Sequence, residues 1–173
     1  MDIPNLMLGG VPLQLHAGVP AQTYSTVGGW TDVQLSGGAL YRMTHFKKQQ
    51  IGISGTGWLG PGFAGLDFSA PLELRCTHPR AIGGSGPLMR SFVLDSDPRP
   101  DVPPWGLAFF ASRDEWVECP VQVSGRNVTC APVPGADLYR VCWMPVYQVL
   151  CSPPDEALND MGGFSWSFTA REV

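Results

Sequence analysis

Residues 163–170 read GFSWSFTA, and this short stretch decides the fold class. Its three aromatic residues, at 164, 166 and 168, alternate with small hydroxyl residues. Alternation with a period of two is typical of a β-strand that buries one face. The stretch PLELRC, residues 71–76, has the same period, with leucine and cysteine on one side and glutamate and arginine on the other. Both stretches are therefore predicted to be half-buried strands.

Weaker alternation of the same kind recurs along the chain, separated by Gly-Gly, Pro-Gly or Ser-Gly steps that favour turns. These further strands are predicted at 11–16, 31–35, 39–46, 49–54, 116–123, 126–131, 137–143 and 146–151. Many short strands joined by turns predict an all-β fold, an antiparallel β-sandwich or a distorted barrel.

The composition agrees with a turn-rich β protein. Charged residues make up 15% of the 173 residues, whereas glycine (21) and proline (17) are abundant. A chain of this length can bury one self-sufficient core, so we expect a single β domain over residues 1–173. The stretch DSDPRPDVPP, residues 95–104, predicts a stiff, exposed connection, and any subdomain boundary is expected there.

One helix is expected. In PPDEALNDMGG, residues 153–163, two prolines precede two acidic residues, and glycine follows, which is the usual order of helix start and stop signals. The fold should contain at most this one short helix, near 153–162.

The charge pattern argues against several partners. The net charge is −4 and the only lysines are Lys47 and Lys48, which gives little basis for binding a nucleic-acid backbone. The apolar runs are much shorter than the ~20 residues that span a bilayer, so no membrane insertion is expected. The start MDIPNLMLGG lacks the basic residue of a signal peptide, which favours a cytosolic site of synthesis and folding.

The five cysteines stand at 76, 119, 130, 142 and 151, without a C-x-x-C pair. This spacing gives no support for a zinc site, and we expect no metal. Buried, reduced thiols are the expected state in a cytosolic protein. A disulfide between Cys130 and Cys142 is the alternative, if they lie on neighbouring strands of one hairpin.

Gly55, Gly57 and Gly60 in QQIGISGTGWLGPG, residues 49–62, spell the G-x-G-x-x-G pattern of dinucleotide-binding proteins. That site also needs a helix beginning within the motif and an acidic residue after the next strand. Pro61, Gly62 and later glycines oppose a helix here. The motif is therefore interpreted as a glycine-rich β turn, and no cofactor is expected.

The following loop, GTGWLGPGFAGLDFSAP (residues 55–71), sets large apolar side chains among glycines and prolines. Such a loop either covers the core or presents anchors to a partner. We name Trp58, Leu59 and Phe63 as candidate inter-subunit contacts, with core coverage as the alternative.

No catalytic residues are identified. Cys76 and His78 are close in sequence, but a catalytic Cys-His pair usually assembles from distant segments, and no G-x-S-x-G elbow exists. The chain is expected not to be an enzyme, although a small hydrolase on a β scaffold stays an alternative. A second alternative is a carbohydrate- or host-surface-binding β module, which would present an aromatic row such as Trp30, Trp58 and Trp105.

Residues 128–145, VTCAPVPGADLYRVCWMP, resemble the strand, Pro-Gly-Ala turn and Tyr-x-Val strand of fibronectin type III modules. The resemblance implies a sandwich-type hairpin with Tyr139, Val141 and Trp143 facing the core.

Over the whole chain, the order of features resembles little-characterised tail proteins of long-tailed bacteriophages. The residues that carry it are 28–82, VPGADLYRVCWMPVYQVLCSPP (133–154) and GGFSWSFTAREV (162–173). The resemblance implies a non-enzymatic structural protein of the virion tail tip or baseplate, assembled in the host cytoplasm. Its implied partners are other tail proteins and copies of itself in a homo-oligomeric ring.

Overall fold

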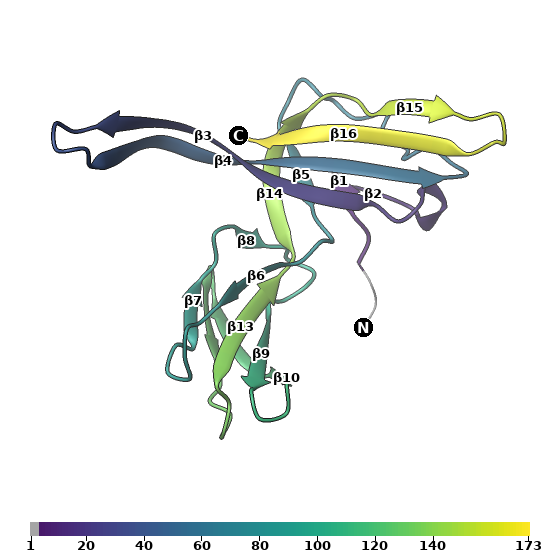
Figure 1. The fold of residues 1–173 in the computed structure, drawn as a ribbon. Helices are drawn as coiled ribbons and strands as arrows, with labels where there is room; N and C mark the ends of the chain where they lie inside the picture. The colour runs from purple at the N-terminus through teal and green to yellow at the C-terminus, as the bar shows by residue number, and fades with distance from the viewer. Residues whose placement is uncertain (1–3) are drawn as a thin grey trace. The chain divides into compact units, whose positions relative to one another are not determined.

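The computed structural model describes residues 4–173, and the fold is all-β with antiparallel sheets, as predicted (Figure 1). The one helical element of the described residues is the 3-10 turn Leu15–Ala17. No helix in residues 4–173 has the length and apolar character needed to cross a membrane. The sheets of these residues form open layers and do not close into a barrel.

The strands, in chain order, have the following bounds. They are β1 (Met7–Leu8), β2 (Val11–Pro12), β3 (Ala21–Gln34), β4 (Leu40–Gly57), β5 (Leu72–Arg75), β6 (Arg80–Gly83), β7 (Ser91–Val93), β8 (Asp97–Pro98), β9 (Trp105–Phe110), β10 (Glu115–Cys119), β11 (Val121–Ser124), β12 (Asn127–Cys130), β13 (Leu138–Trp143), β14 (Pro145–Cys151), β15 (Asp155–Leu158) and β16 (Phe164–Glu172).

The chain divides into two compact units. The first consists of the chain as far as Met7 together with Leu74–Tyr147, and the second consists of Leu8–Glu73 and Gln148–Val173. The proline-rich stretch at residues 95–104 lies wholly within the first unit, and the chain passes between the units elsewhere.

The first unit contains two antiparallel sheets, one in the order β10-β9-β13-β6 and the other in the order β11-β12-β7. Their facing side chains form one buried cluster, as expected for a sandwich. Tyr139, Val141 and Trp143 are all buried in that cluster, as predicted. The indole N–H of the buried Trp143 donates a hydrogen bond to Ser96 Oγ at 3.0 Å.

The hairpin predicted at 128–145 is not formed, which corrects the inference from the fibronectin-like stretch. β12 pairs with β7 and β11, whereas β13 pairs with β6 and β9, so the two strands lie in different sheets. The connection contains Pro132 and Pro134, which have no N–H to donate to a hairpin ladder. Cys130 and Cys142 are therefore not cross-strand neighbours, and all five cysteines are free thiols.

The second unit is built on an antiparallel sheet in which β16 pairs with β4, β4 pairs with β3, and β15 pairs with the other edge of β16. One face of this sheet is buried and carries Ile51, Ile53, Trp166 and Phe168. The loop after β4 and the 3-10 turn contribute to the same core, because Phe63 packs against Phe168 and Trp166 Nε1 donates to the Ala17 carbonyl at 2.8 Å.

The helix predicted near 153–162 is wrong, because residues 155–158 form β15 and pair with residues 164–167 of β16. The signal that decides this segment is a turn. Asn159 Oδ1 accepts hydrogen bonds from the N–H groups of Met161 and Gly163, at 3.1 and 2.7 Å, and Gly162 adopts a φ of +79°. An Asx turn of this kind closes a hairpin, which then competes with the weak local helix signals.

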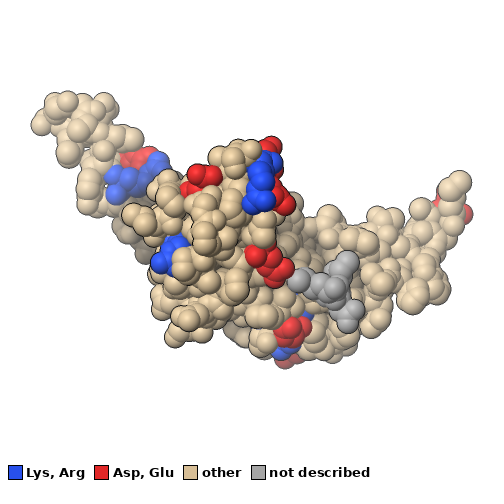
Figure 2. Space-filling view, turned by 90° about the horizontal axis from the view of Figure 1, so that it is seen from below, with Lys and Arg blue, Asp and Glu red and all other residues tan. Residues whose placement is uncertain are grey.

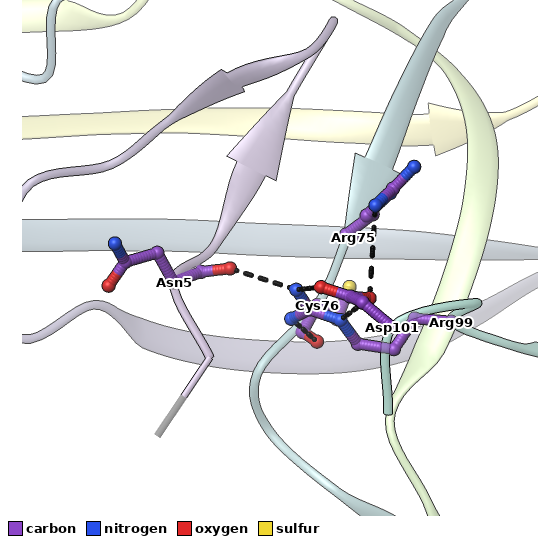
Figure 3. Close-up of polar contacts among 5 residues, drawn as sticks. All are labelled: Asn5, Arg75, Cys76, Arg99 and Asp101. Carbon is purple, nitrogen blue, oxygen red and sulfur yellow. Dashed lines mark hydrogen bonds and ion pairs between the residues drawn. The ribbon is translucent and has the colours of Figure 1, made fainter. Parts of the chain in front are cut away.

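A buried arginine ties three segments of the first unit together (Figure 3). Arg99 is 2% exposed, and its guanidinium donates two hydrogen bonds, of 2.8 and 2.6 Å, to the carboxylate of Asp101. Two further N–H groups donate to the carbonyls of Cys76 and Asn5, at 3.0 and 3.2 Å. The charge is thus compensated by a carboxylate whose pKa is lowered mainly by the hydrogen bond from Arg99.

Candidate assembly surface

The three candidate contacts in the loop after β4 differ in burial. Trp58 is 62% exposed and meets the ring of His16 edge-on, with 5.0 Å between ring centroids, and Leu59 is also exposed. Phe63 is fully buried and packs against Phe168 at 5.9 Å. The prediction of Phe63 as an inter-subunit contact is therefore corrected: Phe63 is a core residue, and only Trp58 and Leu59 are displayed.

The G-x-G-x-x-G pattern does not form the predicted turn at its first two glycines, which serve packing within a strand. Gly55 and Gly57 lie inside β4, where they pair with Trp166 and Phe164 of β16. A Cβ at Gly55 would stand 2.4 Å from the Trp166 ring, and one at Gly57 would stand 2.3 Å from the His16 carbonyl oxygen. The glycines thus let an indole and the 3-10 turn approach the strand closely.

The outer part of the β3–β4 hairpin, residues 27–48, exposes large apolar side chains, and we call it the arm. β16 pairs with β4 only at residues 50–57, so the arm has two strands and no third (Figure 1). All residues from 30 to 48 are exposed. A two-stranded hairpin is only marginally stable alone in water, so the arm depends on its own cross-strand pairs or on a partner.

The arm presents apolar side chains on one face. The odd-numbered residues of β3 and their cross-strand partners share this face, since directly opposed residues point the same way. Between the turn and Phe46 the face carries no charged residue. Its large side chains, all exposed, are Val27, Val33, Tyr41, Met43 and Phe46, and we call them the apolar face.

The opposite face of the arm carries its charges. Arg42 donates two hydrogen bonds of 2.6 Å to the carboxylate of its cross-strand partner Asp32, and this hydrogen bonding holds the pKa of Asp32 below its ordinary value. The same guanidinium lies 5.9 Å from the Trp30 ring centroid, and Trp30 covers Gly28. These contacts hold the two strands in register without using the apolar face.

Charged side chains are sparse over much of the visible surface, and blue and red groups often lie beside each other (Figure 2). The end of the arm, at the left of this view, carries neither colour.

Nearer the body of the second unit, the apolar face continues as a surface of small residues. Ser54 is paired with both Ala21 and Ser167, and Thr56 is paired with Ser165, so these side chains share one face. They line a hollow of about 630 Å³, together with Asp155 and other residues of β15. The hollow and the apolar face thus belong to one pairing face of a continuous pair of strands, and the two strands cross between these regions (Figure 1).

Other predicted sites receive no support from the geometry. Trp30 of β3 pairs with Thr44, and Trp58 follows the end of β4, about 45 Å further along the extended strand. Trp105 belongs to the other unit, so no aromatic row forms within a unit. Residues 4–173 contain no group of three His, Cys, Asp or Glu side chains placed to hold a metal. Cys76 is fully buried whereas His78 is exposed.

No family model, no curated protein and no solved structure matches this chain.

The sequence predicted the two strands of the arm, at 31–35 and 39–46, but not that they project as a pair. Alternation shows that a strand has two unlike faces, and it does not show whether a third strand or a core covers one of them. The available signal was the Gly37–Gly38 turn between two short apolar patterns, which indicates a hairpin.

Proposed function

We propose that this chain is a non-enzymatic structural subunit that assembles with copies of itself or with other proteins. The observation that supports this proposal most directly is the arm, an exposed two-stranded hairpin with large apolar side chains on one face. Exposed apolar patches of this kind usually mark sites of protein association. Trp58 and Leu59, displayed at the other end of β4, extend the set of candidate contacts.

The assembly that the sequence resemblance suggests is the tail tip or baseplate of a long-tailed bacteriophage, built in the host cytoplasm. Low charge and exposed aromatic side chains suit a surface that becomes buried against neighbours. Other tail proteins and a homo-oligomeric ring are the proposed partners.

The test is to delete the reading frame from the phage or prophage that carries it and to complement it with a tagged copy. We expect the tagged chain in purified particles by mass spectrometry, with the tag located at the tail tip by gold labelling and electron microscopy. Normal infectious particles that lack the chain would refute the structural role.

A further inference from the structure

We propose that Cys119 and Cys130 are a redox-active thiol pair, and that hydrogen peroxide converts them into a disulfide that joins the two sheets of the first unit. The inference names a modification site apart from the surfaces described above. It goes beyond the proposed function and does not depend on it.

A corner in the chain at Pro120 brings the two cysteines together. Cys119 is the last residue of β10, and Cys130 is the last residue of β12 in the facing sheet. Pro120 alone separates β10 from β11, so the chain passes from one sheet to the other at this residue. The Pro120 carbonyl accepts a hydrogen bond from the N–H of Ala131 at 2.8 Å, which holds the end of β12 beside the corner.

Gly106 of β9 makes room for both sulfur atoms. It is the cross-strand partner of Cys119. A Cβ at Gly106 would stand 2.9 Å from Cys119 Sγ and 3.0 Å from Cys130 Sγ. The two sulfur atoms therefore share the space that the missing side chain leaves, and one thiol hydrogen-bonds the other. From this contact, a rearrangement of the two side chains brings the sulfur atoms to the ~2.05 Å of a disulfide.

Both cysteines belong to the buried cluster of the first unit, and each also borders a hollow. The hollow at Cys119 has a volume of about 330 Å³, and the hollow at Cys130 has a volume of about 230 Å³. A water molecule takes up about 30 Å³ in the liquid, so a molecule as small as hydrogen peroxide fits in either hollow.

The two thiols differ, and the difference assigns them separate roles. Cys119 keeps 3% of its surface exposed, whereas Cys130 is fully buried. Burial raises the pKa of both thiols, that of Cys130 to about 12. The hydrogen bond between them opposes this rise in pKa at Cys119 and adds to it at Cys130, as expected when Cys130 donates and the Cys119 sulfur accepts. Cys119 therefore reacts with peroxide first, and Cys130 resolves the intermediate.

One molecule of hydrogen peroxide balances the reaction. The Cys119 thiol gives up its proton, its sulfur attacks one peroxide oxygen, the O–O bond breaks, and the other oxygen leaves as water with that proton. Cys119 is then a sulfenic acid. Cys130 Sγ attacks Cys119 Sγ, so the S–S bond forms, the S–O bond breaks, and a second water leaves with the proton of the Cys130 thiol. Both sulfur atoms are oxidised, and both peroxide oxygens are reduced.

The test is treatment of the native, purified full chain with one equivalent of hydrogen peroxide, followed by denaturation, alkylation and peptide mass mapping. All five cysteines are free thiols before the treatment. We expect the intact chain to lose two hydrogen atoms and to keep three cysteines that can be alkylated. The mapping should find Cys119 and Cys130 in one linked pair of peptides.

Single variants test the two roles. Cys130→Ala should stop at the sulfenic acid, which dimedone then labels at Cys119, whereas Cys119→Ala should leave Cys130 without label. Cys142→Ala is the matched control, because Cys142 is buried in the same unit but lies outside the cluster that holds the pair. It should form the link at the wild-type rate. The wild-type map tests the proposal even if an alanine variant fails to fold.

Several results would overturn the proposal. These are five cysteines still open to alkylation after the peroxide treatment, oxidation confined to the partly exposed Cys151, or a link between any other two cysteines. A link that forms only after denaturation also overturns it, because the native fold then keeps the sulfur atoms apart. Equal dimedone labelling of Cys130 in Cys119→Ala and of Cys119 in Cys130→Ala would contradict the order of the two steps.

Discussion

Phe63 and Trp58 belong to one loop, yet burial gives them different roles. Phe63 is fully buried against Phe168, so Phe63→Ala should lower the free energy of unfolding by about 3–5 kcal/mol, the usual cost of truncating a core aromatic. Trp58→Ala is the matched control and should cost less than about 1 kcal/mol, because its ring lies largely in solvent. Urea unfolding measures both. An equal decrease in the free energy of unfolding for both variants would mean that Phe63 is not a core residue.

Arg99 and Arg126 make the same kind of ion pair, one buried and one exposed, so they isolate the effect of burial on stability. Arg99, in the interior, donates two hydrogen bonds to Asp101. Arg126, on the surface, donates two hydrogen bonds to Asp97. Arg99→Met leaves the carbonyl groups of Cys76 and Asn5 without their donor, so it should cost about 2–4 kcal/mol. Arg126→Met should cost at most about 1 kcal/mol, as exposed ion pairs do. Melting temperatures that fall equally would show that the interior site is as well hydrated as the surface.

At the scale of elements, the arm is separable from the sheet that carries it. The arm supplies no residue to the core, so its removal should not unfold the second unit. Replacing residues 28–47 by Asn-Gly joins the cross-strand pair Val27 and Lys48 through a two-residue hairpin turn. We expect a melting temperature within a few degrees of the wild type, together with loss of self-association. A variant that unfolds would show that the arm stabilises the sheet.

The element scale also explains the glycine motif. Gly55 and Gly57 belong to a strand because the chain on both sides pairs with β3 and β16. The spacing of the glycines alone does not distinguish a glycine required by a phosphate from one required by an indole ring, since both need a missing Cβ. The residues that follow the motif argued against the phosphate, because Pro61 and Gly62 oppose the helix that such a site needs.

At the scale of the whole molecule, the titrating groups predict a stability plateau between about pH 5 and pH 9. Burial raises the pKa of Cys130 from 9.0 to about 12, with further increases from Cys119. The folded chain therefore binds the extra proton, and this stabilisation is complete below pH 9.0 and lost as the pH rises toward about 12. At the acid end, arginine partners lower the pKa of Asp97 and Asp101 below 3.8, so their stabilisation is lost as the pH falls through those values.

Melting temperatures measured from pH 3 to pH 11 check this profile. Cys130→Ala should flatten the alkaline decline, although its smaller core side chain lowers the melting temperature at neutral pH. A wild type whose melting temperature rises between pH 9 and pH 11 would contradict the assignment of a buried, protonated thiol.

The sequence by itself determined the all-β class and the inward face of particular strands. The alternation in residues 163–170 fixed which side chains of β16 are buried, and the Tyr-x-Val pattern did the same for Tyr139 and Val141. Period-two patterning is local, so it can be read without knowing which strands are neighbours.

Only the tertiary structure decided which strands pair and which apolar side chains stay exposed. It placed β12 and β13 in different sheets, turned residues 155–158 into a strand and buried Phe63 while leaving Trp58 and the arm in solvent. These outcomes depend on contacts between segments far apart in the chain, such as β4 with β16. The composition of one segment does not specify the surface that another segment will cover.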